Sequence, residues 1–124
     1  IALLKQKGII VVLITGKGMN SCDITLKQFN MKTSFAKVIT GNAERNIKAE
    51  ALKGLLCDYH LAANEVVYVG DALSDITECR KANVMCLSAA WNIPQSENRA
   101  LESYNPKNVF YSIFSLSEYL NART

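Results

Sequence analysis

The segment IIVVLI, residues 9–14, constrains the fold of this chain more than any other stretch. All of its residues are apolar and most are β-branched. Gly8 ends a helical pattern before the segment, and Thr15-Gly16 begins a loop after it. A continuous apolar run of this length predicts a strand that is covered on both faces, as strands of parallel sheets are.

Strand-like and helix-like patterns alternate along the rest of the chain. The pattern predicts helices that end at residue 7 and that cover 20–29, 47–59, 74–82 and 115–122, and further strands over 36–40, 65–69, 84–88 and 108–111. A loop rich in Pro, Asn and Ser is expected between the last two strands. Short connections leave room for parallel strands with helical crossovers, so we expect one doubly wound α/β domain.

The composition excludes several classes of function. The 14 basic residues are scattered and the net charge is only +3, which argues against nucleic-acid binding. No apolar run approaches the roughly 18 residues of a membrane span. The four cysteines form no C-x-x-C pair, and the one histidine has no partner motif, which disfavours zinc. Reduced thiols partly in the core, and hence a cytoplasmic location, are expected.

In a doubly wound sheet, ligands bind beyond the carboxyl ends of the strands. One such end carries Gly70-Asp71, with Asp75 four residues later at the start of a predicted helix. Two neighbouring carboxylates repel each other unless a cation or a proton lies between them, and hard oxygen ligands suit Mg²⁺. The alternative is structural, since Gly-Asp is a common turn and an acid in a first helical turn favours the helix dipole.

Two further positions fit an anionic ligand. Thr15 and Gly16 offer a hydroxyl and an accessible backbone N–H at a strand end, where a phosphoryl oxygen could bind; alternatively, Thr15 caps the next helix. Lys48 begins a predicted helix, although the dipole there disfavours a cation. A functional reason would be to direct its charge into an anionic site, and the alternative is an ordinary solvated lysine.

The order of these features resembles the haloacid dehalogenase (HAD) superfamily of phosphatases and related hydrolases. LITGK looks like the second motif of that family, Lys48 like the third, and VYVGDALSD like the fourth. The tail, YNPKNVFYSIFSLSEYL, and SAAWN look like the capped, phosphoglycolate-phosphatase-like subgroup, which we favour. The lack of a proline after Lys48 is more similar to the capless sugar-acid phosphatases.

The resemblance implies a role for each matching residue. Asp71 would bind Mg²⁺ directly, and Asp75 would bind the ion or hold its water. Thr15 and the Gly16 amide would grip the phosphoryl group of a small phosphorylated metabolite. Lys48 would neutralise the phosphoryl oxygens and the nucleophile, so that the implied activity is phosphomonoester hydrolysis through an aspartyl-phosphate.

The first motif of the family is absent. The family's nucleophile lies in an Asp-x-Asp motif after the first strand, and the sequence contains no Asp-x-Asp. We therefore expect residues 1–124 to be the C-terminal portion of a HAD-like core domain, lacking the first strand and any cap domain. In the family that strand lies between the strands that carry Thr15 and Asp71. Its loss would leave apolar edges for an N-terminal segment or a swapped copy to cover.

Other interpretations stay open. The chain could be a catalytically inactive, truncated HAD-like module that acts as a binding or structural unit. A receiver-like or nucleotide-binding module is less consistent, because the acidic pair of a receiver is missing. GKGMNS also lacks the third glycine of a dinucleotide loop. The upstream sequence separates the first two interpretations.

Overall fold

The computed structural model describes residues 1–15, 19–28, 30–31, 34–41 and 48–123. The chain divides into two compact units, Ile1–Ile47 and Lys48–Thr124, and each is described by itself. Among the described residues, no helix is both long and apolar enough to cross a membrane.

The first unit is a small α/β arrangement. It contains α1 (Ala2–Gln6), β1 (Val12–Ile14), α2 (Met19–Gln28) and β2 (Lys37–Ile39). The strands β1 and β2 run parallel, with Leu13 opposite Val38. Thr15 extends this pairing, because its backbone N–H donates to the Ile39 carbonyl at 2.9 Å. The predicted strand at 9–14 is therefore present, although its ladder is shorter than the apolar run.

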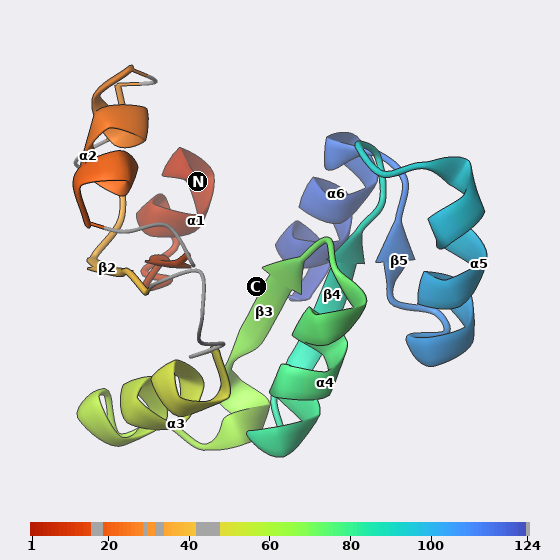
Figure 1. Ribbon diagram of the computed structural model, residues 1–124. Helices are drawn as coiled ribbons and strands as arrows, with labels where there is room; N and C mark the ends of the chain where they lie inside the picture. The colour runs from red at the N-terminus through yellow and green to blue at the C-terminus, as the bar shows by residue number, and fades with distance from the viewer. Residues whose placement is uncertain (16–18, 29, 32–33, 42–47, 124) are drawn as a thin grey trace. The chain divides into compact units, whose positions relative to one another are not determined.

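The second unit contains a three-stranded parallel sheet in the order β3-β4-β5 (Figure 1). Its strands are β3 (Val67–Gly70), β4 (Met85–Ala89) and β5 (Val109–Phe110). The register places Tyr68 opposite Cys86 and Ser88 opposite Val109. β4 is the central strand, and the middle of its sequence is buried on both faces, as its nearly continuous apolar pattern predicts.

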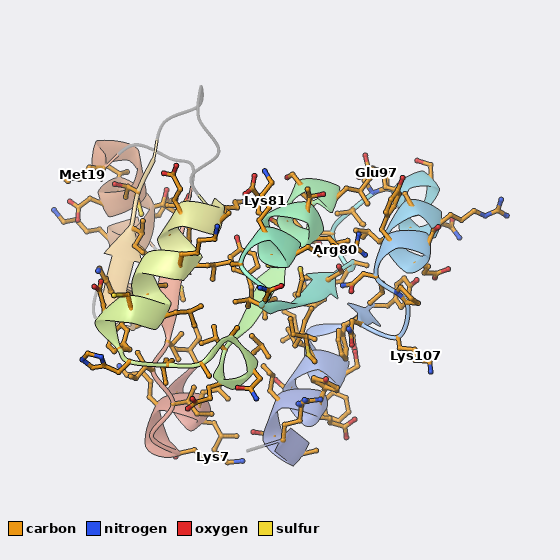
Figure 2. All side chains as sticks on the ribbon, turned by 90° about the horizontal axis from the view of Figure 1, so that it is seen from below. Lys7, Met19, Arg80, Lys81, Glu97 and Lys107 are labelled. Carbon is orange, nitrogen blue, oxygen red and sulfur yellow. The ribbon has the colours of Figure 1, made fainter. Side chains whose placement is uncertain are left out.

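Helices cover both faces of this sheet. They are α3 (Lys48–Asp58), α4 (Leu73–Lys81), α5 (Gln95–Tyr104) and α6 (Ile113–Arg123), with a short 3₁₀ turn, η1 (Ala63–Glu65), before β3. α4 lies on one face and α6 on the other, and α3 packs against α4 (Figures 1 and 2). Leu87 of β4 and Leu101 of α5 are almost completely buried and anchor the core. The predicted parallel α/β architecture is confirmed.

The prediction of a loop between β4 and β5 is wrong in part, because this segment contains the ten-residue helix α5. The cluster of Pro, Asn and Ser favoured a loop, but Pro94 stands directly before the helix, where its fixed φ is tolerated. Most of α5 is exposed and polar, so few apolar residues mark its buried face. Leu101 supplies the burial, and the side chain of Asn105 holds the helix end by donating to the Cys86 carbonyl at 2.9 Å.

β3 is the edge strand of its sheet and carries exposed apolar side chains. Among the described strands, β3 pairs with β4 alone and β1 pairs with β2 alone. Val67 and Val69 of β3 are 40% and 42% exposed. Such an edge is the feature that the sequence predicted for this strand.

Candidate functional site

The fourth motif lies where β3 passes into α4, at the carboxyl end of the sheet (Figure 1). Gly70 is the last residue of β3, and the exposed Asp71 follows it. α4 begins at Leu73, so that Asp75 lies in its first turn. The side chain of Asp75 is only 2% exposed, and a carboxylate that is buried to this extent needs partners.

The two oxygens of Asp75 have different partners. Oδ1 forms an ion pair with Nζ of Lys48, the first residue of α3. Oδ2 accepts a hydrogen bond from the Ala72 backbone N–H at 3.0 Å, which satisfies one of the free donors at the start of α4. Asp75 is therefore both a helix cap and the counter-ion of Lys48, and it joins two helices from distant parts of the sequence.

Lys48 begins a helix, as its sequence pattern predicted. Lys48 opens α3, and its side chain is 24% exposed, so it reaches both Asp75 and water. The unfavourable dipole at this position is offset by the buried carboxylate of Asp75. This geometry explains why a cation stands at the start of α3, where it would otherwise be unfavourable.

Gly70 is required for the close approach of Asp75 to the strand. A Cβ atom at position 70 would lie 2.6 Å from Cγ of Asp75 and 2.8 Å from Cε1 of Tyr68, both far inside van der Waals contact. Glycine therefore allows the carboxylate and the tyrosine ring to pack over the end of β3. The Gly-Asp sequence here is a packing requirement as well as a turn.

Tyr68 is a site neighbour that was not predicted. Burial raises the pKa of its hydroxyl above the ordinary range, and the negative charge of Asp75 raises this pKa further. The hydroxyl therefore stays protonated beside the carboxylate. The signal was available in the sequence, since Tyr68 and Gly70 are two residues apart and so share one face of the strand.

Two thiols lie next to this group. Cys79 follows Asp75 by one helical turn on α4, and Cys86 stands opposite Tyr68 on β4. Both are buried. The pKa of Cys79 is raised, mainly by a hydrogen bond with Cys86 and next by burial of the thiol. The sequence predicted thiols in the core, and the i, i+4 spacing from Asp75 could have placed Cys79 beside it. Among the described residues all cysteines are free.

Asp71 is the carboxylate that remains available. No hydrogen bond or ion pair holds its side chain within the described part of the chain, and the side chain is exposed. The described residues bring no three His, Cys, Asp or Glu side chains together as a metal site. Mg²⁺ accepts one or two carboxylates and completes its shell with water and substrate oxygens. The exposed carboxylate of Asp71 could therefore serve as a direct ligand of Mg²⁺. Both oxygens of Asp75 already have partners, so this carboxylate is better suited to an indirect role next to the metal.

The second motif belongs to the other unit. Thr15 directly follows β1 and is partly buried, which is the strand-end position that the sequence predicted. Gly16 lies outside the described residues. Lys48, Asp71 and Asp75 all belong to the second unit, and it is there that the structure brings predicted residues together.

Solved structures share this fold. The chain matches the core domain of a Streptococcus pneumoniae protein assigned as a phosphoglycolate phosphatase, with a TM-score of 0.71 and 19% identity. The match covers 97% of this chain and 81% of that chain. It matches a Thermotoga maritima protein assigned as a β-phosphoglucomutase with a TM-score of 0.77 and 15% identity, over 95% of this chain and 56% of that chain.

A third match is a Lactobacillus delbrueckii protein assigned as a phosphoglycolate phosphatase, with a TM-score of 0.78 and 16% identity, over 95% of this chain and 49% of that chain. The chain thus spans about half the length of the second and third structures. These identities are low, so the likeness concerns the fold, which is HAD-like. A search of curated proteins finds no significant match.

A comparison with models of protein families identifies the family of this chain. The model of the haloacid dehalogenase-like hydrolases matches residues 1–89, which contain all the predicted site residues. The chain belongs to the haloacid dehalogenase-like hydrolase family. The resemblance noted in the sequence is confirmed, and the fold neighbours include proteins assigned to the subgroup that it favoured.

Proposed function

We propose that this chain works as part of a Mg²⁺-dependent phosphomonoester hydrolase that forms an aspartyl-phosphate. The nucleophile would come from sequence upstream of Ile1. The observation that carries the proposal is the ion pair between Lys48 and the buried Asp75, close in sequence to the exposed Asp71. Membership of a hydrolase family supports the same conclusion.

Asp71 and Asp75 would divide the work of holding the metal. The exposed carboxylate of Asp71 would bind Mg²⁺ directly, and Asp75 would hold a water of the ion while it keeps Lys48 in place. When bound, Mg²⁺ neutralises charge that develops on a phosphoryl group. The cap that Asp75 provides to α4 fixes its carboxylate in advance, so that it need not be ordered when substrate binds.

Lys48 would supply the protein's own positive charge. Its ammonium is partly exposed, so it can contact an anion without giving up Asp75. A phosphoryl group carries negative charge on several oxygens, and a fixed cation beside it lowers the cost of transfer. Thr15 and Gly16 are assigned to grip the phosphoryl group on the family resemblance alone.

The substrate class is a small phosphorylated metabolite. Two of the fold neighbours are assigned as phosphoglycolate phosphatases and one as a β-phosphoglucomutase, all names of chemistry on small phosphorylated compounds. The free thiols suit a reducing, cytoplasmic compartment.

A second candidate is an inactive HAD-like module that binds a partner. The sequence favours it in one respect, because it contains no Asp-x-Asp motif. The full-length gene product distinguishes the two. We expect an upstream Asp-x-Asp after an apolar strand and release of inorganic phosphate from a panel of small phosphomonoesters, dependent on Mg²⁺ and abolished by EDTA. A folded full-length protein without that motif and without turnover would establish the inactive module instead.

A further inference from the structure

A pocket of about 660 Å³ lies in the second unit, at the opposite end of the sheet from Asp71. It is formed by η1, the starts of β3 and β4, the turn after α4 and the last turn of α6. Val67 and Met85, which face each other as the first paired residues of β3 and β4, lie in its wall. Asp71 follows the other end of β3, so the pocket is separate from the candidate site.

The charged residues that line this pocket are basic. Arg80 of α4 and Arg123 of α6 line it, together with Asn64 and Asn83, and none of the described lining residues is an Asp or a Glu. Within the described part of the chain, neither arginine forms a salt bridge. Arg80 and Arg123 are thus the charged residues among the described residues of the lining, and both carry positive charge.

The arginine side chains are held in place by neutral groups. The guanidinium of Arg80 donates through Nη2 to the Tyr104 carbonyl at the end of α5, and Figure 2 shows Arg80 between α4 and α5. Arg123 donates to the Tyr119 hydroxyl, and its guanidinium carbon lies 5.0 Å from the centre of the Tyr119 ring. A guanidinium has five N–H donors, so each arginine keeps donors for a ligand.

Tyr119 is itself fixed by packing. Its ring lies 5.1 Å from that of Phe110, centre to centre, and its hydroxyl donates to Sδ of Met85 at 3.7 Å. Met85 lines the pocket, so that the same contacts order the apolar wall and Arg123. Side chains that are ordered before binding lose less conformational entropy when a ligand arrives.

The rest of the wall is apolar. Val66, Val67, Val84 and Met85 supply it, and Val84 is only 5% exposed. A bare inorganic anion would leave this wall in contact with water. An anion with an apolar body would cover it, and pockets with apolar walls and a few convergent polar groups are typical of small-molecule sites.

We propose that this pocket binds a small organic anion, with its carboxylate or phosphate group at Arg80 and Arg123 and its apolar part on the valine wall. The proposal does not depend on the phosphatase activity. Since Arg80 lies on the same helix as Asp75, a ligand here would also contact the element that holds Lys48.

The probe is phenylphosphonate, which phosphatases cannot hydrolyse, titrated into the full-length protein in EDTA and followed by calorimetry. We expect saturable binding that weakens about tenfold in Arg80→Gln and in Arg123→Gln, as loss of one charge-assisted hydrogen bond predicts. Arg99→Gln on the exposed face of α5 is the matched control and should bind like the wild type. Inorganic phosphate should bind more weakly than phenylphosphonate.

Three outcomes would overturn the proposal. They are no saturable binding up to about 10 mM, equal binding by all three arginine variants, and binding that Asp71→Asn removes while Arg80→Gln leaves it intact, which would locate the probe at the candidate site. Arg123→Lys, which keeps the charge but loses the planar fork, separates binding from folding. It should retain the wild-type melting temperature and an intermediate affinity.

Discussion

Lys48 and Asp75 form an ion pair across 27 residues of sequence, between the first residue of α3 and the first turn of α4. Asp75 is 2% exposed, whereas Lys48 is 24% exposed, so the pair has one buried and one accessible end. The accessible end is the cation. In the proposed site this asymmetry would let the acid fix the lysine while the ammonium stays accessible to an anion.

Replacing Lys48 by methionine tests both parts of this relationship. Asp75 would lose its positively charged partner and keep neutral ones such as the Ala72 N–H, so we expect the free energy of unfolding to fall by about 1–3 kcal/mol. Turnover of the full-length enzyme should fall by about two orders of magnitude or more. Lys53→Met, at an exposed position of the same helix, should change neither quantity appreciably. An unchanged rate in Lys48→Met would mean that another lysine meets the substrate.

Two glycines give a matched pair for the packing of the site. Gly70→Ala places a Cβ 2.6 Å from Cγ of Asp75, so we expect a loss of about 1–3 kcal/mol from overpacking and a disturbed site. Gly54→Ala, in α3, meets no atom within 4 Å and should stabilise the protein by up to about 1 kcal/mol. Chemical denaturation measures both. Equal effects of the two substitutions would contradict the contact between β3 and Asp75.

Tyr68 predicts the behaviour of the protein at alkaline pH. Its folded-state pKa is raised, first by burial and then by Asp75. A group with a raised folded pKa stabilises the fold fully below its unfolded pKa, near 10, and this contribution is lost as the pH rises above that value. Wild-type stability should therefore fall more steeply between pH 9.5 and about 11.5 than that of Tyr68→Phe. Parallel curves for the two proteins would show that Tyr68 is not buried beside a carboxylate.

The cysteines should differ in their reaction with a thiol reagent. Cys57 is exposed, whereas Cys22, Cys79 and Cys86 are buried. The raised pKa of Cys79, caused by its hydrogen bond to Cys86 and by burial, keeps it a protonated and poorly nucleophilic thiol at pH 8. Alkylation followed by peptide mass spectrometry should modify Cys57 first and Cys79 only on unfolding. Early modification of Cys79 in the native protein would contradict its placement.

The parts of the fold that follow from periodicity were predictable. The apolar runs located each strand in the described part of the chain, and the strand-end rule placed Asp71 and Thr15 directly after strands, where the structure has them. Lys48 stood out because its charge is wrong for the start of a helix. These sequence patterns could not predict which side chain each site residue contacts. The ion pair to Asp75 depends on how α3 packs against α4, which no local pattern specifies.

Other features of the structure were not predicted, and the reasons can be identified. The helix α5 was missed because turn-forming residues surround it and few of its residues are buried, so tertiary contacts at Leu101 and Asn105 rather than local pattern secure it. The pocket at Arg80 and Arg123 could not be predicted because it joins residues between 63 and 85 to Arg123, far away in the sequence. To predict Tyr68 as a neighbour of the site, both the register of β3 and the burial of Asp75 would have had to be known.

The most direct test of the central claim is the rate of phosphate release by the full-length gene product, measured with and without Mg²⁺ for the wild type and Asp71→Asn. Asp71 is exposed, so its substitution should change stability by no more than about 0.5 kcal/mol. The account predicts Mg²⁺-dependent hydrolysis by the wild type and a loss of about 100-fold or more in kcat/KM for the variant. A folded Asp71→Asn protein with turnover near that of the wild type would contradict it.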